Sequence, residues 1–270
     1  MNKKISVSFL FDKKNKWFSE SYLKELKSAL PKGYKYYFSF NFKKVKGYDI
    51  LFLINYTKIL PKDFLISNKL NLVLHSSNLP MDRGFSPAFN QILRNRNTIT
   101  TCLIEAKEKV DTGNIYMKNK FRLDGNELSR EIRAKQALAM IQLVTLFLKK
   151  YPKIKSIKQK AGGSFNPRRR PSDSEINIDK SLKSQFNLLR INDNENFPSF
   201  FYFKKKKYIL KIYNNSELMI DNLLTYKKIN NITHQRLIWK MHNDITSRKY
   251  SVNKESFSNK NHVKWLKDIL

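Results

Sequence analysis

Residues 49–56, DILFLINY, and residues 71–75, NLVLH, are the two stretches that decide the fold. The first is an almost continuous apolar run, which is typical of a central strand that a parallel sheet buries on both faces. The second run is also apolar and ends on His75. Because ligands of such sheets bind at the carboxyl ends of the strands, we expect His75 to lie at a functional site.

Strand and helix patterns alternate on both sides of these runs. Further apolar runs predict strands at residues 4–11, 34–40 and 98–106. Helical spacing of apolar residues predicts helices at residues 19–30, 88–93 and 126–150. The order predicts an α/β fold, in which residues 1–150 form a doubly wound domain with a mostly parallel sheet.

The composition changes after Tyr151. Residues 151–173 are basic and contain glycine and proline, which favours a linker. A short helix is predicted at 177–191, and a hairpin is predicted to turn around Lys204–Lys207. We therefore divide the chain into an N-terminal domain, a small mixed C-terminal region and a helical tail, at residues 1–150, 151–215 and 216–270.

The formal net charge is +31, from 53 lysines and arginines against 22 aspartates and glutamates. Such a charge is typical of nucleic-acid-binding proteins. Here the lysines are spread along the whole chain together with asparagines, and only Arg168–Arg170 and Lys204–Lys207 are dense clusters. We favour a biased composition over nucleic-acid binding, although a positive field attracts any phosphorylated substrate.

Other function classes are excluded by simple counts. No run of about 18 apolar residues is present, so no membrane-spanning helix is expected. The single cysteine, Cys102, rules out an internal disulfide and fits a reducing cytoplasm, where we expect the protein to act. Cys102 lies in an apolar run and is predicted to be a buried strand thiol. The four histidines show no metal-ligand spacing, so no metal is expected.

Three short motifs follow one another in the N-terminal domain: HSSNLP at 75–80, RG at 83–84 and DTG at 111–113. Together with the flanking strands they resemble the folate-dependent formyltransferase family, whose pattern is N-x-H-x-S-L-L-P, then R-G, then D-T-G or D-S-G about 30 residues later. The resemblance covers most of residues 1–150. It implies transfer of the formyl group of 10-formyltetrahydrofolate, as co-substrate, to an amine.

One branch of this family is more similar than the others. LPMDRGFSP at 79–87 followed by NQIL at 90–93 resembles the nucleotide-sugar branch, in which LP-x-x-x-G-W-S-P precedes W-Q-I-L. Phe85 stands where that branch has tryptophan. The acceptor implied by this resemblance is a nucleotide-linked 4-amino-4,6-dideoxy sugar.

The resemblance also implies roles for individual residues. His75 would donate to the developing oxyanion or take the amine proton, and Asp111 would orient its imidazole. The folate would lie against the residues that follow His75 and against the DTG turn, at Ser77, Asn78, Leu79, Pro80 and Asp111.

One position departs from the family pattern. The family has asparagine two residues before the histidine, and this chain has Val73. Asn71 and Asn78 are the candidate replacements for that amide, and Asn78, in the loop itself, is favoured as a catalytic residue. Without either amide the oxyanion would depend on His75 and backbone N–H groups.

The rest of the chain also has resemblances. Residues 168–213 resemble the small C-terminal region of sugar and transfer-RNA formyltransferases. Its arginine cluster suits phosphate binding, but exposed loop arginines are more often solvated, and we favour solvation. The tail resembles the opening of GNAT-type acetyltransferases acting on amino-sugar nucleotides, which favours a truncated fusion over a chance helical tail. The residues concerned are Trp239, Asn243, Asp244, Arg248, Ser251, His262 and Trp265.

The sequence therefore predicts a cytoplasmic N-formyltransferase for a nucleotide-linked amino sugar in surface-glycan biosynthesis. Methionyl-tRNA formyltransferase, which the charge would suit, is the first alternative. A non-catalytic relative that binds an amino sugar or RNA is the second. A homodimer is compatible with the sequence.

Overall fold

The computed structural model describes residues 4–13, 17–18 and 20–215. The chain divides into two compact units, Met1–Lys211 and Ile212–Leu270. The acetyltransferase-like tail, including Trp239 and His262, lies outside the described residues. No helix in the described part of the chain is long and apolar enough to cross a membrane.

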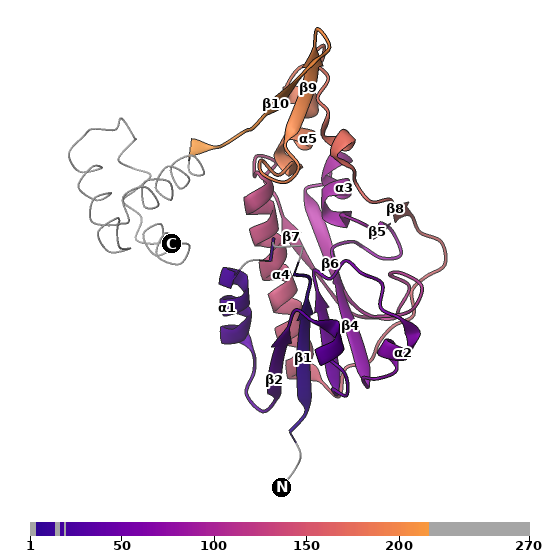
Figure 1. The fold of residues 1–270 in the computed structure, drawn as a ribbon. Helices are drawn as coiled ribbons and strands as arrows, with labels where there is room; N and C mark the ends of the chain where they lie inside the picture. Colours follow the sequence, from indigo (N-terminus) through magenta and orange to yellow (C-terminus); the bar gives the residue numbers. More distant parts are fainter. Residues whose placement is uncertain (1–3, 14–16, 19, 216–270) are drawn as a thin grey trace, which may run out of the picture. The chain divides into compact units, whose positions relative to one another are not determined.

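A six-stranded sheet forms the centre of the first unit, in the order β2-β1-β3-β4-β6-β7 (Figure 1). Its strands are β1 (Ser6–Phe11), β2 (Lys35–Ser39), β3 (Ile50–Ile54), β4 (Leu70–His75), β6 (Thr98–Glu105) and β7 (Ile115–Arg122). The first four strands are parallel, and β6 and β7 join as antiparallel neighbours. The predicted α/β fold with a mostly parallel sheet is confirmed.

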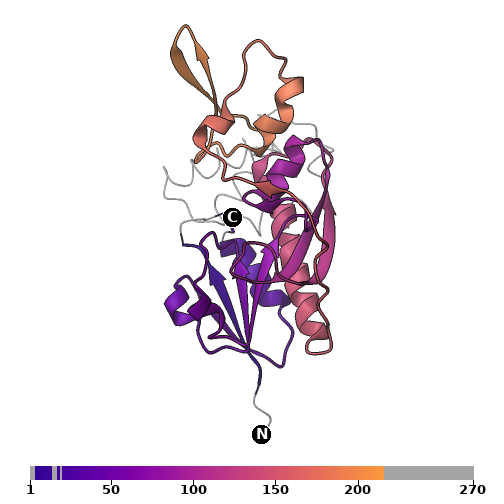
Figure 2. The same cartoon turned by 90° about the vertical axis from the view of Figure 1, so that its right-hand side faces the viewer.

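Apolar side chains alternate between the two faces of the sheet, because successive residues of a strand point to opposite sides. On one face, Phe9 of β1 stacks on Phe52 of β3, with ring centroids 5.2 Å apart, and Phe147 meets Phe52 edge-on at 5.8 Å. Phe147 belongs to α4 (Ser129–Lys150), which covers this face together with α1 (Glu20–Ala29) (Figure 2). The four-residue helix α2 (Lys62–Leu65) packs Phe64 against the opposite face.

Strand β7 was not predicted from the sequence. Its residues, IYMKNKFR, mix apolar and charged side chains, and most of them keep part of their surface exposed. It lies at the edge of the sheet, where β6 is its neighbouring strand. An edge strand needs no continuous apolar run, which is why its pattern was weak.

The remaining described elements are short, with seven residues or fewer each. They are η1 (Phe42–Lys44), β5 (Arg83–Gly84), α3 (Pro87–Leu93), β8 (Phe165–Asn166), η2 (Pro171–Ser174), η3 (Lys183–Gln185), α5 (Phe186–Ile191), β9 (Ser199–Phe203) and β10 (Lys206–Leu210). The predicted hairpin is present as β9 and β10, and Lys204 and Lys205 form its turn with left-handed backbone angles. The fully buried Arg190 of α5 donates to Asn97 at 2.7 Å and so ties the C-terminal region to the sheet domain.

Residues 151–173 differ from the predicted linker. Ile157 pairs with Ile115 of β7, and β8 pairs in parallel with β5. Glycine and proline are common in linkers, but here backbone groups of Ile157, Ser164 and Asn166 form hydrogen bonds with Ile115, Arg83 and Phe85. We call residues 157–166 the closing segment.

Candidate active site

His75 is the last residue of β4 and only 6% of its surface is exposed. Its ring lies between two acceptors: Nε2 is 2.8 Å from the backbone oxygen of Asp82, and Nδ1 is 3.4 Å from Oδ2 of Asp111. A carbonyl oxygen only accepts hydrogen bonds, so Nε2 donates in this contact. Nδ1 is then the ring nitrogen that faces the carboxylate, which is an arrangement suited to proton transfer.

Asp111 is held in place by its neighbours. Its backbone is in the left-handed region, with φ 55°, and its Oδ2 accepts from the N–H of Gly84 at 2.8 Å. Gly113 completes the turn, and a side chain there would collide with the backbone oxygen of Glu105. The structure therefore brings together His75, the RG pair and the DTG turn, although 36 residues separate the first from the last.

Asp82 fixes the other side of the His75 ring and was not singled out from the sequence. It is buried, and its carboxylate pairs with Arg94 and lies 3.8 Å from Arg96. Its backbone N–H donates to Oγ of Ser164 at 2.9 Å. No periodicity or motif marks this residue, because its role comes from a backbone oxygen and from partners in distant parts of the chain.

The closing segment binds the same turns from the opposite side. Nε2 of Gln159 donates to the backbone oxygens of Asp111 and Gly113 at 2.8 and 2.7 Å. Oε1 of Gln159 accepts from Arg83 at 3.2 Å. Gly163, with φ 114°, passes so close to Pro80 that a side chain would collide with the Pro80 oxygen. These contacts leave no signal in the sequence, because the segment has the composition of a linker.

The loop after His75 exposes few of its side chains. Ser77 and Leu79 are buried, and the backbone oxygen of Ser77 accepts from the Cys102 thiol at 2.9 Å. Cys102 is the buried strand thiol that the sequence predicted, and burial raises its pKa. Asn78 is exposed, and its Oδ1 accepts from Nζ of Lys118 at 2.8 Å. Because an ammonium group only donates, the NH₂ of the Asn78 amide faces away from Lys118.

Part of the chain is also similar to a known family of domains. Residues 41–144 match the formyl transferase family. The matched range contains His75, Asn78, Asp82 and Asp111, and it ends before the closing segment.

Among curated proteins, this chain is similar to methionyl-tRNA formyltransferase from Rickettsia canadensis. The two are 32% identical over 106 residues, which are 39% of this chain and 35% of the relative. The chain thus spans about a third of the length of that relative.

Solved structures of formyltransferases share the fold of this domain. Methionyl-tRNA formyltransferase from Clostridium thermocellum has a TM-score of 0.67 at 23% identity, covering 78% of this chain and 93% of that chain. A 4-N formyltransferase from Francisella tularensis has a TM-score of 0.62 at 17% identity, covering 77% and 97%. HypX from Aquifex aeolicus in complex with tetrahydrofolic acid has a TM-score of 0.60 at 14% identity, covering 78% and 38%.

Val73 occupies an apolar position in the central sheet. It is half-buried and pairs in register with Leu53 of β3 and Ile104 of β6. Asn71, one of the two candidate replacement amides, is fully engaged elsewhere: its Nδ2 donates to the backbone oxygen of Leu65 at 2.7 Å, and its Oδ1 accepts from Asn68 at 3.1 Å. Asn71 therefore fastens the end of α2, and Asn78 is the candidate amide with a free donor among the described residues.

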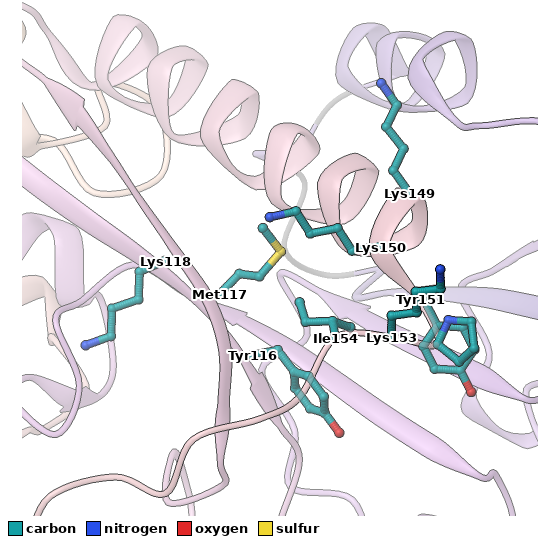
Figure 3. A pocket seen from close by; sticks show the side chains of 9 residues that line it. Tyr116, Met117, Lys118, Lys149, Lys150, Tyr151, Lys153 and Ile154 are labelled. Carbon is teal, nitrogen blue, oxygen red and sulfur yellow. The ribbon is translucent and has the colours of Figure 1, made fainter.

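A hollow of about 730 Å³ lies at the C-terminal end of α4. It is lined by Tyr116, Met117, Lys118 and residues 149–154. Figure 3 shows that the side chains of Lys118 and Lys149 extend in different directions, so their ammonium groups do not converge on one ligand. Neither His75 nor Asp111 lines this hollow.

Proposed function

We propose that this protein transfers the formyl group of 10-formyltetrahydrofolate to the amine of a nucleotide-linked 4-amino-4,6-dideoxy sugar, in the cytoplasm and for surface-glycan biosynthesis. The observation that supports formyl transfer most directly is the buried His75–Asp111 pair, with 3.4 Å between Nδ1 and Oδ2, at the end of a strand within the matched residues 41–144. The LP-x-x-x-G-F-S-P stretch at 79–87 supports a sugar acceptor.

The residues around His75 suit a folate formyl donor. Asn78 presents unengaged amide donors at the surface, and Pro80 adds a half-buried apolar surface two residues later. The HypX structure with tetrahydrofolic acid, which has the same fold, supports this donor. When bound, 10-formyltetrahydrofolate supplies an activated one-carbon carbonyl. We propose that it lies against the loop from Ser77 to Pro80 and against Asp111.

The proposed chemistry needs one group that accepts a proton and one that donates a hydrogen bond to the oxyanion. His75, whose Nε2–H is held by the Asp82 oxygen, takes at Nδ1 the proton that the amine nitrogen loses as its bond to the formyl carbon forms. The Asp111 carboxylate, 3.4 Å from Nδ1, stabilises the imidazolium that results. His75 then gives this proton to the folate nitrogen as its bond to the formyl carbon breaks. One C–N bond forms and another breaks, the products are the formamide and tetrahydrofolate, and no proton is gained or lost overall.

Asn78 is the proposed donor to the formyl oxygen while that oxygen gains negative charge. An oriented donor of this kind is typically worth about 10²- to 10³-fold in rate. Lys118 acts as a positioning residue, because its contact with Oδ1 turns the NH₂ of Asn78 away from the lysine. This pair compensates for Val73, whose apolar side chain offers no hydrogen bond.

The proposal is tested by incubating the purified full chain with 10-formyltetrahydrofolate and a panel of acceptors, and measuring tetrahydrofolate release. We expect turnover with nucleotide-linked 4-amino sugars and none with the corresponding 4-hydroxy sugars, which lack the attacking amine. Selective formylation of methionyl initiator transfer RNA, without turnover on any amino sugar, would show that the acceptor is this transfer RNA and not a sugar. Absence of turnover with every amine would favour the non-catalytic alternative.

Methionyl-tRNA formyltransferase is the second candidate, because the curated relative from Rickettsia canadensis has that activity in its name. The net charge of +31 would favour contact with RNA phosphates. Since the basic residues are dispersed, we expect RNA binding to be unselective and to be lost steeply with salt. Initiator-selective binding that survives moderate salt would favour this candidate over the sugar.

A further inference from the structure

Three consecutive arginines follow the closing segment, and their surroundings differ. Arg169 is half-buried and donates to the backbone oxygen of Asp173 at 2.9 Å and to Oδ1 of Asn192 at 3.3 Å. The side chain of Arg170 is exposed and has no hydrogen bond or ion pair with a described residue. The guanidinium of Arg168 lies over the ring of Phe85, 4.7 Å from the ring centroid.

The contact with Phe85 holds Arg168 without using its hydrogen-bond donors. A guanidinium group carries its five N–H donors in its own plane, so stacking occupies the face and leaves the edge free. Within the described residues no carboxylate or other acceptor engages this edge. Arg168 is therefore a positive charge next to the Phe85 ring with unused donors among the described residues, and a guanidinium edge of this kind can bind phosphate in a bidentate manner.

Arg168 is connected to the His75–Asp111 pair through short contacts. The N–H of Phe85 donates to the Asn166 oxygen at 3.0 Å, and the preceding N–H, of Gly84, donates to Oδ2 of Asp111 at 2.8 Å. Arg168 follows Asn166 by two residues. Arg168 thus lies two residues after β8, which pairs with β5, and Gly84 of β5 binds the Asp111 carboxylate.

The charges around this strand pair leave a positive excess. The buried carboxylate of Asp82 is already compensated by Arg94 and Arg96. Arg83 donates to the neutral Gln159, and its Nε is buried without a partner. Arg83 and Arg168 are therefore two cations beside the active site that no described carboxylate neutralises, which favours binding of an anionic ligand.

We propose that Arg168, supported by the ring of Phe85, binds the diphosphate of the acceptor while His75 acts on the amine of the same molecule. This assignment rests on the proposed function, because it names the part of the acceptor that the protein recognises. Two negative charges on one ligand match an arginine whose donor edge is free. The substrate class that follows is a nucleoside diphosphate sugar rather than a free amino sugar.

The test compares Arg168→Gln with Arg170→Gln, a matched change at the exposed arginine two residues later. We expect Arg168→Gln to raise KM for the nucleotide-linked amino sugar at least tenfold, with kcat and the KM for 10-formyltetrahydrofolate within twofold of wild type. Arg168→Lys should recover part of the loss, since lysine keeps the charge but not the bidentate edge. Arg170→Gln should change KM less than twofold.

An equal rise of KM in Arg168→Gln and Arg170→Gln would overturn the assignment, since the loss of positive charge alone would then explain both. A change confined to the KM for 10-formyltetrahydrofolate would also overturn it, because Arg168 would then bind the folate carboxylates and not the diphosphate. Because Arg168 is exposed, both variants should melt at the wild-type temperature.

Direct binding separates this assignment from the proposed function. Uridine diphosphate is titrated calorimetrically into the wild-type full chain and into the Arg168→Gln and Arg170→Gln variants. We expect at least tenfold weaker binding for Arg168→Gln alone. Such binding without turnover on any amine would retain the phosphate site and reject formyl transfer. If Arg168→Gln turns over the nucleotide-linked sugar with an unchanged KM, the reaction is retained and the phosphate site is rejected. The phosphate site is also rejected if uridine diphosphate binds equally well to the wild type and to Arg168→Gln.

Discussion

Two parts of the chain that are built differently meet at His75: the six-stranded sheet and the closing segment, residues 157–166. In the sheet, buried apolar residues such as Phe9 and Phe52 form a continuous core between the strands and α4. The closing segment is attached by the two-residue pairing of β5 with β8 and by polar side chains such as Gln159 and Ser164. Apolar burial is non-directional, whereas hydrogen bonds prescribe an angle. The sheet therefore provides stability and fixes where His75 lies, and the hydrogen bonds of the closing segment orient the turns around it.

Removing a ring from the sheet should give the largest effect. Phe52 has no exposed surface and contacts Phe9 and Phe147. Phe52→Ala is expected to lower the free energy of unfolding by about 3–5 kcal/mol, because the substitution leaves a cavity. Urea unfolding followed by circular dichroism measures this change. An equal loss of unfolding free energy in Ser164→Ala would show that the closing segment stabilises the fold as much as the sheet core does.

Changing His75 or Asp111, the proposed catalytic pair, should reduce turnover without comparable loss of stability. His75→Ala and Asp111→Asn are each expected to lower kcat by about 10²-fold or more, because both residues act on groups that change charge during the reaction. Folate binding, measured by fluorescence quenching, should remain near the wild-type value. Near-wild-type turnover in either variant would exclude that residue from the mechanism.

A smaller effect is expected from Gln159→Ala in the closing segment. The variant loses the hydrogen bonds to the backbone oxygens of Asp111 and Gly113, so the carboxylate is less well fixed beside His75. We expect kcat to fall about tenfold, with the KM of the acceptor unchanged and the free energy of unfolding lowered by only about 1 kcal/mol.

Gln159→Glu separates the two functions of this side chain. It keeps an acceptor for Arg83 but loses the donor to the turn, so its kcat should fall at least as far as that of the alanine variant. Lys158→Ala, at the exposed neighbouring residue, serves as the control. Full activity in Gln159→Glu would mean that the contact with Arg83, not the turn, is what matters.

The smallest effect is expected at Glu127, which lies before α4 and pairs with Lys135 and with the buried Arg190. Burial alone would raise the pKa of Glu127, but Lys135 and the N–H groups of Asp124 and Gly125 lower it from 4.5 to about 2. Its stabilising contribution is therefore present above pH 4.5 and is lost as the pH falls toward 2. Glu127→Gln should cost about 1 kcal/mol at pH 7 and little near pH 2. A difference that stays constant over this range would contradict the ion-pair explanation.

Local patterns made the central part of the fold predictable. The apolar runs at 49–56 and 71–75 predicted β3 and β4, because a strand buried on both faces is mostly apolar. The lysines at 204–207 marked the hairpin turn. Strand β7 escaped prediction, since an exposed edge strand lacks such a pattern.

The site was predictable only where a motif marks it. His75 and Asp111 came from the family pattern, and the structure places them side by side. Asp82 acts through its backbone oxygen, and Gln159 acts across 46 and 48 residues, so neither produces a periodic signal. The choice between Asn71 and Asn78 also required the structure, because the two amides differ only in the neighbours that engage them.

The parallel pairing of β5 with β8 limits how this domain can be exchanged between proteins. A crossover placed directly after α4 would transplant all six strands, His75 and Asp111, yet leave Gln159 and Asn166 behind. The grafted piece would fold around the same core but carry a loosely held carboxylate. A crossover after Asn166 keeps these contacts in one inherited block. For this architecture the smallest portable unit is therefore longer than the part that can be recognised by similarity.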